Sequence, residues 1–170
     1  MCRLHGFKQH MSKRCPKNPF LVLKIDQLVD ATLGHPMMSF LEAFQGYHQL
    51  ALALEDQEKT SFITLTSNFH YRVMPFRLKN VGSTYQGMVT KTFKEQLGKN
   101  MGAYIDDMVM KSRAMGGHLT DLTKTFETLQ KYCLKLNASK CTFGVNSGNF
   151  LGYLVIHRGI EVNPHQIIAL

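Results

Sequence analysis

Apolar residues recur at helical intervals in two long stretches of the chain. The first stretch opens at Ser83, which has capping-box spacing to Gln86, and it ends at Gly98. Its apolar positions are Tyr85, Met88, Val89, Phe93 and Leu97. The second stretch has the apolar positions Leu119, Leu122, Phe126, Leu129, Cys133 and Leu136. Both patterns predict amphipathic helices with these residues facing the core, and Asp26–Leu33 predicts a shorter helix.

Shorter apolar runs predict β-strands. The run Met37–Leu41 leads directly into Glu42. Further strands are expected over Lys59–Thr64, Phe69–Met74, Met101–Ile105, Met108–Lys111, Lys140–Phe143 and Asn149–Val155. Leu65–Asn68 would connect the first two of these, and Gly152 would let another backbone approach closely. Helices and hairpins in this order predict an α+β fold, with helices packed on an antiparallel sheet.

Two adjacent carboxylates, Asp106 and Asp107, separate the predicted strands Met101–Ile105 and Met108–Lys111. An Asp-Asp connection suits a tight hairpin turn, because Asp tolerates unusual backbone angles. Two carboxylates at one hairpin tip repel each other, and divalent metal ions would relieve that repulsion. Mg²⁺ prefers carboxylate oxygens together with substrate phosphates. Taken alone, the pattern fits either a metal site or a simple solvated turn.

The composition is that of a globular domain with a basic surface. The chain has 170 residues, of which 44% are hydrophobic, and a formal net charge of +8. This charge favours a polyanionic partner such as a nucleic acid. The apolar runs are far too short to cross a bilayer, and the first residues lack the apolar stretch of a signal peptide. We expect an intracellular protein, in the cytoplasm or nucleus and not secreted, without a disulfide framework.

The first 20 residues are basic and poorly periodic. Within them, Cys2, His5, His10 and Cys15 have the spacing of a retroviral zinc knuckle, with His in the place of the second Cys. Tetrahedral Zn²⁺ accepts such a mixed ligand set. Chance is the simpler explanation of the spacing. We therefore expect residues 1 to about 20 to be loosely ordered and to bind no zinc.

Several sequence blocks occur in the order found in one polymerase family. They are Ile25–Thr32, Ser39–Phe44, Gly46–Tyr47, Lys59–Thr64, Val73–Phe76, Leu78–Asn80, Thr84–Gln86, Tyr104–Asp107, Lys135–Asn137, Lys140–Cys141, Phe150–Tyr153 and Arg158–Glu161. On these blocks the chain resembles the reverse transcriptase of gypsy-type LTR retrotransposons, in the form common in plants. The resemblance implies a polymerase palm with part of the fingers over residues 21–170, ending before the thumb. Residues 1–20 would be a degenerate basic N-terminal segment.

The resemblance implies an RNA-directed DNA polymerase, the reverse transcriptase domain of a retrotransposon Pol polyprotein. In that family three carboxylates hold two Mg²⁺ ions, with Mn²⁺ as an alternative, for nucleotidyl transfer. Asp106 and Asp107 match the pair at the hairpin, and Glu42 stands at the position of the third, at the end of the first palm strand. The implied partners are an RNA template with a DNA primer and deoxynucleoside triphosphates, and no membrane.

The resemblance also implies residues that bind the nucleotide and the primer. Tyr47 would screen the 2′ position of the sugar, and an aromatic residue of the core is the alternative. Phe76 and Arg77 belong to a loop beside the nucleotide and template. The hairpin that resembles the primer grip, which places the primer end, consists of Phe150, Leu151, Gly152 and Tyr153.

The chain departs from the family at several positions. The family has Asp at the position of Glu42 and Gly at the position of Arg77. The extra methylene of Glu42 displaces the carboxylate by more than about 1 Å, which costs on the order of a hundredfold in rate. By the resemblance, we expect the chain to lack an upstream segment with an Arg that contacts the triphosphate, and to lack the thumb and the RNase H domain. We therefore expect a truncated, partly degenerate copy with impaired activity. The alternative is a catalytically inactive nucleic-acid-binding remnant of a retroelement.

Overall fold

A four-stranded antiparallel sheet forms the centre of the molecule, in the strand order β4-β5-β1-β6. A computed structural model describes residues 25–157 and 159–162. The predictions for residues 1 to 20, including the spacing of Cys2, His5, His10 and Cys15, lie outside the described residues. The strands of the sheet are β1 (Met37–Glu42), β4 (Met101–Tyr104), β5 (Asp107–Ser112) and β6 (Thr142–Val145).

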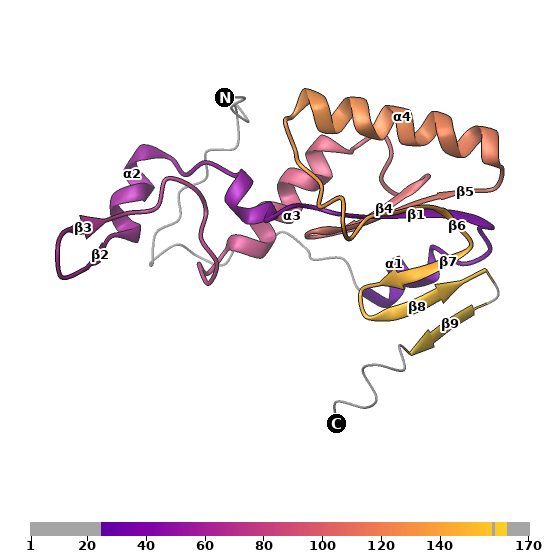
Figure 1. The fold of residues 1–170 in the computed structure, drawn as a ribbon, viewed down its shortest axis with the longest axis horizontal. Helices are drawn as coiled ribbons and strands as arrows, with labels where there is room; N and C mark the ends of the chain where they lie inside the picture. Colours follow the sequence, from indigo (N-terminus) through magenta and orange to yellow (C-terminus); the bar gives the residue numbers. More distant parts are fainter. Residues whose placement is uncertain (1–24, 158, 163–170) are drawn as a thin grey trace.

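Different layers cover the two faces of this sheet (Figure 1). The long helices α3 (Val81–Thr92) and α4 (Met115–Lys131) lie on one face. The short helix α1 (Ile25–Asp30) and a second antiparallel sheet lie on the other face. The strands of that second sheet are β7 (Ser147–Phe150), β8 (Tyr153–Ile156) and β9 (Gly159–Val162). The arrangement confirms the predicted α+β class.

Alternate residues of the central strands build two separate cores. On β5, Met108 and Met110 pack with α3 and α4, while Val109 between them packs with α1 and the hairpin β7–β8. On β1, Leu41 belongs to the core with α3 and α4, and Phe40 belongs to the core with α1 and the hairpin β7–β8. This follows from the strand period of two, which sends neighbouring side chains to opposite faces. Among the described residues, no helix is long and apolar enough to span a membrane.

A smaller lobe projects from the sheet, in purple at the left of Figure 1. It contains the 3₁₀ turn η2 (Glu58–Thr60), the helical turn α2 (Leu54–Gln57), and the strands β2 (Phe62–Ile63) and β3 (Asn68–Phe69). The 3₁₀ turn η1 (Gly46–Gln49) lies between this lobe and the sheet, in contact with α3. The predicted strands Lys59–Thr64 and Phe69–Met74 are therefore too long. All residues of β2 and β3 are exposed, so little apolar burial is available to extend the pairing of the two strands. The rings of Phe62 and Phe69 stack across the pair, with their centroids 5.9 Å apart.

Both long helices differ from their predicted boundaries. Helix α3 begins at Val81 after Asn80, and the Ser83 hydroxyl donates to the Asn80 carbonyl, so the predicted capping box is wrong. Helix α3 ends at Thr92 rather than near Gly98. Helix α4 ends at Lys131, and the residues beyond it leave the helix. Cys133 there has a left-handed backbone with φ 55°, which a helix cannot continue through.

The buried face of α4 is rotated from the predicted apolar stripe. Leu122 and Leu129 are buried as predicted, whereas Leu119 and Phe126 are 61% and 43% exposed. The buried face is completed by two polar residues, His118 and Thr125, which are 1% and 0% exposed. These four buried positions follow helical spacing, but two of them escape a search for apolar residues.

Candidate active site

The hairpin that carries the two aspartates turns one residue earlier than predicted. Tyr104 pairs with Asp107, so the two connecting residues are Ile105 and Asp106. Ile105 has a left-handed backbone with φ 52°, and Asp107 is the first residue of β5. Cross-strand bonding fixes the boundary, because Asp107 already belongs to the ladder with β4. The predicted Asp-Asp turn is therefore wrong in register, although both residues remain at this end of the hairpin.

The side chain of Gln86 on α3 bonds to the backbone of this turn. Its side-chain amide donates to the Ala103 carbonyl at 3.1 Å, and its side-chain carbonyl accepts from the Ile105 amide at 2.7 Å. Gln86 is completely buried. A buried amide that satisfies two backbone groups fixes the hairpin relative to α3. The sequence analysis predicted Gln86 as the partner of Ser83 in a capping box and missed its bonds to the hairpin.

The structure brings the three predicted carboxylates to one end of the central sheet. Glu42 is the last residue of β1 and pairs directly with Asp107 on β5. The Ala43 amide, next in the chain, donates to the Asp106 carbonyl at 2.8 Å. Residues that pair directly across antiparallel strands have Cβ atoms about 5 Å apart. The prediction that Glu42 lies on the strand beside Asp107 is confirmed.

Asp106 occupies an unfavourable electrostatic position. Burial, together with the charges of Asp107 and Glu42, raises the pKa of its carboxyl to about 6, against the lowering effects of Tyr85 and Lys140. Its Oδ1 atom is buried without a hydrogen-bond partner. The pKa of Asp107 is also raised, by burial and by Glu42. The site thus gathers negative charge that its own hydrogen bonds do not offset.

Gly46 lies directly against this carboxylate. A Cβ atom placed on Gly46 would be 2.0 Å from Asp106 Oδ1 and 2.5 Å from the Tyr85 hydroxyl oxygen. The nearby Tyr85 side chain lowers the pKa of Asp106, in the direction that favours the charged carboxylate. Only glycine fits at position 46, so this residue sets how closely η1 approaches the carboxylates.

Lys140 and its neighbours hold Glu42 from the other side. The Lys140 ammonium lies 2.6 Å from Glu42 Oε1, and this hydrogen bond raises the pKa of Lys140. The Glu42 amide donates to the Cys141 sulfur at 3.4 Å, and the Asn137 amide donates to the Glu42 carbonyl at 2.8 Å. Within residues 25–157 and 159–162, no three acidic, His or Cys side chains are grouped to hold a metal ion. The ammonium of Lys140 is the cation that Glu42 contacts.

Tyr47 lies beside Asp106, and Phe76 packs against Tyr47. The Tyr47 ring makes edge contacts with Phe76 at 5.2 Å and with Tyr85 at 5.3 Å. Burial raises the pKa of Tyr47, and so does the charge of Asp106. Tyr47 is only partly buried, and Phe76 is 56% exposed. The structure therefore groups Tyr47 and Phe76 near Asp106.

Arg77 has a left-handed backbone with φ 70°. That conformation suits glycine and is unfavourable for a residue with a Cβ atom. The resemblance described above implies Gly at this same position. The loop therefore keeps a glycine-like conformation with an arginine in it.

The hairpin of Phe150, Leu151, Gly152 and Tyr153 forms as predicted, with Phe150 paired to Tyr153. Leu151 and Gly152 make the turn, with φ 53° and 87°. Phe150 is buried against Phe40 of β1, with ring centroids 6.3 Å apart. The hairpin is thus anchored on the sheet face opposite α3 and α4. Its role as a primer grip stays a prediction.

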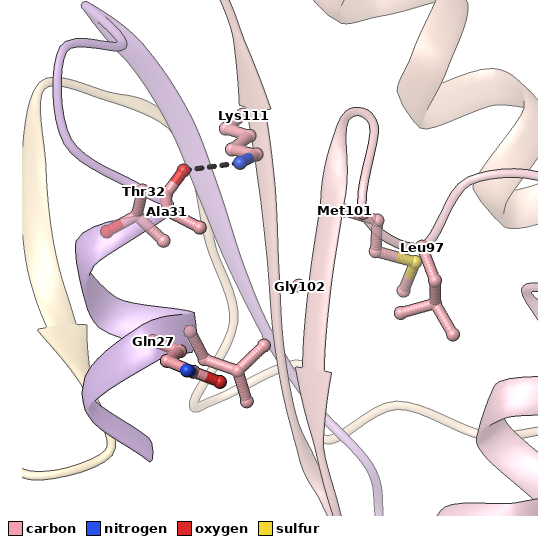
Figure 2. A pocket seen from close by; sticks show the side chains of 9 residues that line it. Gln27, Ala31, Thr32, Leu97, Met101, Gly102 and Lys111 are labelled. Atoms are coloured by element: carbon pink, nitrogen blue, oxygen red, sulfur yellow. Dashed lines mark hydrogen bonds between the residues drawn. The ribbon is translucent and has the colours of Figure 1, made fainter. Parts of the chain in front are cut away.

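A cavity of about 190 Å³ lies elsewhere, between α1 and the strands β4 and β5. Figure 2 shows the Lys111 ammonium at its edge, donating to the Ala31 carbonyl of the turn after α1. Burial lowers the pKa of Lys111. Glu42, Asp106 and Asp107 do not line this cavity, so it is separate from the carboxylates.

Comparison with known proteins agrees with this geometry. The sequence model of the family described as reverse transcriptase (RNA-dependent DNA polymerase) matches residues 2–155. The Pol polyprotein of Drosophila melanogaster transposon 297 is 32% identical over 130 residues, which are 76% of this chain and 12% of that protein. The Pol polyproteins of transposons opus and gypsy are 32% and 29% identical over 141 and 144 residues, 82% and 84% of this chain. The chain spans 14% of the length of each of these two relatives.

Solved structures share the fold. A foamy viral protease-reverse transcriptase in complex with an RNA/DNA hybrid has a TM-score of 0.79 at 17% identity, covering 88% of this chain and 20% of that one. Its complex with double-stranded DNA has a TM-score of 0.82 at 17% identity, covering 90% and 32%. These findings confirm the predicted palm-like fold and the predicted family. The chain belongs to the reverse transcriptase family, as the reverse transcriptase domain of a gypsy-type retrotransposon Pol polyprotein.

Proposed function

We propose that residues 21–170 are the palm and part of the fingers of an RNA-directed DNA polymerase, with Glu42, Asp106 and Asp107 as its catalytic carboxylates. The observation that carries this proposal is the buried, unpartnered Oδ1 of Asp106 beside two further carboxylates. An unpaired buried charge is costly, and such sites are typical of bound cations or catalysis.

The reverse transcriptase family uses divalent metal ions. The donor atoms are of the kind that such ions take, because Mg²⁺ and Mn²⁺ bind carboxylate oxygens. We assign Asp106 and Asp107 as ligands and Glu42 as the third, which requires Glu42 to leave Lys140. Two bound ions would stabilise the charge that develops when a primer 3′-hydroxyl attacks a nucleoside triphosphate.

Other residues of the chain would prepare the site. Gln86 fixes the hairpin, and Gly46 leaves room for the Asp106 carboxylate. Tyr47 and Phe76 would contact the deoxynucleoside triphosphate, and Arg77 lies in the same loop. The hairpin Phe150–Tyr153 would place the primer. Basic residues would bind the phosphates of an RNA template and DNA primer without reading sequence, in line with the +8 charge.

A second candidate is an inactive nucleic-acid-binding remnant. The ion pair between Glu42 and Lys140 favours it, because Lys140 takes the carboxylate that a metal ion needs. Glu42 is also longer by one methylene than the Asp of the family, so we expect slow catalysis even with metal bound.

Primer extension on an RNA template with a DNA primer tests the proposal, in Mg²⁺ and in Mn²⁺. We expect weak extension that Asp106→Asn abolishes, while Asp30→Asn, an exposed substitution on α1, leaves it unchanged. Duplex binding should weaken steeply as salt rises, through counterion release. Salt-dependent binding without extension in either metal would favour the remnant, and a flat salt response would contradict both candidates.

A further inference from the structure

His118 is a buried polar residue that the proposed chemistry does not use. It lies on α4, is 1% exposed, and faces the central sheet on the side of the long helices. Two strands contact it. Its Nε2 lies 2.7 Å from the Ser39 hydroxyl of β1, and its Nδ1 lies 3.0 Å from the Ser112 hydroxyl of β5.

The network around His118 has one consistent direction. The Ser112 hydroxyl donates to Asp121 Oδ2, at 3.4 Å. Ser112 then accepts from His118 Nδ1–H, which leaves His118 Nε2 to accept from the Ser39 hydroxyl. The Ser39 oxygen in turn accepts the Gly144 amide of β6 at 3.0 Å. This chain of bonds requires a neutral imidazole protonated at Nδ1, and burial lowers the pKa of His118 in the same sense, although Asp121 opposes it.

The Ser39 end of the network lies at a break in strand pairing. Met38 pairs with Val145, but Phe40 pairs with Thr142, so β6 has one extra residue opposite Ser39. This is a β-bulge, and Gly144 within it has φ 61°. The bulge interrupts the hydrogen bonds between β1 and β6, and the Ser39 hydroxyl accepts the Gly144 amide in their place.

Three contacts anchor the segment beside Glu42. They are the bond from the Asn137 amide to the Glu42 carbonyl, the pairing of Thr142 with Phe40, and the bond from the Gly144 amide to the Ser39 hydroxyl within the bulge. Lys140 and Cys141 lie between these anchors and contact Glu42 through its carboxylate and its amide. Loss of the Gly144 bond would loosen the segment at its C-terminal end, where the pairing of Thr142 with Phe40 remains.

We propose that His118 is a positioning residue: through Ser39 and the β6 bulge, its Nε2 holds Lys140 and Cys141 against Glu42. The geometry stands on the hydrogen bonds alone, whereas its value for polymerisation rests on the proposed function. The two nitrogens of His118 have unequal roles. The bond from Ser39 to Nε2 fixes the bulge, and the bond from Nδ1 to Ser112 only orients the ring.

Alkylation of Cys141 by iodoacetamide, followed by peptide mass spectrometry on the full chain, tests this inference without metal or substrate. Gln at position 118 has a polar group near the place of Nε2, and Asn has one near the place of Nδ1. We expect His118→Asn to raise the Cys141 rate about tenfold, the order set by one lost buried hydrogen bond, and His118→Gln to restore a near-native rate.

Ser39→Ala should raise the rate as His118→Asn does, and Ser112→Ala should not, so this pair decides the question if a His118 variant fails to fold. Thr125→Ala is the matched control, because it removes a buried hydrogen bond of α4 to Gln96 without touching Ser39. Equal rates in the Asn and Gln variants, no change in either, or an equal rise in Thr125→Ala would overturn the proposal. Failure of primer extension in the unaltered chain would overturn the proposed function and leave this result intact.

Discussion

Replacing Asp106 with Asn should stabilise the metal-free protein. The substitution keeps the shape of the side chain and removes a charge that is partly buried beside two other carboxylates. Burial and the neighbouring charges raise the pKa of Asp106 from 3.8 to about 6. A shift of about two pKa units corresponds to about 3 kcal/mol. Because the carboxyl is partly open to solvent, screening reduces the gain to about 1–2 kcal/mol.

The pH dependence has a defined sign. With its folded-state pKa raised, Asp106 binds a proton in the folded protein at pH values where it is ionised in the unfolded chain. The contribution of Asp106 therefore raises stability as pH falls from about 7 through 6 toward 4. Asp106→Asn should lack this contribution. The affinity for metal ions should instead fall as pH falls, since protonation of Asp106 below about pH 6 removes a ligand.

Thermal unfolding of the full chain in chelator provides the assay. At pH 7.5 or so, Asp106→Asn should raise Tm by about 2–8 °C, given about 2–4 °C per kcal/mol for a domain of this size. Mn²⁺ should raise Tm of the unaltered protein and not that of the variant, because a ligand of the folded state stabilises it by mass action. Asp30→Asn should change neither. A lower Tm for Asp106→Asn in chelator would refute the argument that this carboxylate is destabilised by its surroundings.

Three further substitutions test the remaining parts of the site. Arg77→Gly should stabilise the fold by roughly 1 kcal/mol in urea unfolding, because glycine adopts the left-handed backbone at this position without strain. Arg113→Gly should destabilise the fold. Equal effects of the two substitutions would contradict the strain at Arg77. Gly46→Ala should lower the free energy of unfolding by about 1–3 kcal/mol and abolish Mn²⁺ binding. Gly117→Ala, with open space around it on α4, should leave the stability unchanged or raise it. Tolerance of Ala at position 46 would mean that η1 can move away. Glu42→Asp, in a chimaera with the Pol polyprotein of a related transposon, should raise primer extension in Mg²⁺ by roughly tenfold or more, which lowers the barrier by at least about 1.4 kcal/mol. An active chimaera with an unchanged rate would show that Glu42 is tolerated.

The sequence predicted the central strands well, because their burial is apolar and periodic. Met37–Leu41 and Met108–Lys111 are strands, and Glu42 lies beside Asp107 as the block order implied. The hairpin register was wrong by one residue, because Ile105 adopts a left-handed backbone that nothing in its residue type suggests. Local propensity thus placed the strands but not the turn between them.

Polar residues with structural roles were the part that sequence patterns missed. Gln86, His118 and Thr125 are buried through hydrogen bonds, and an amphipathic pattern counts such residues as surface. Lys140 was found as part of a family-like block, but its pairing with Glu42 joins residues 98 positions apart. Only the fold brings such pairs together.

The division of the two cores limits what kind of mutation this retroelement sequence tolerates. Met108 and Met110 face one layer and Val109 the other, so a single inserted or deleted residue in β1 or β5 would exchange the two sets. The same slip would carry Glu42 away from Asp107. Replacement of one residue by another, as at position 42 at the end of β1, leaves the register intact. Drift in these strands can therefore proceed by replacement, with catalysis lost well before the fold, whereas one in-frame codon gained or lost there would remove both at once.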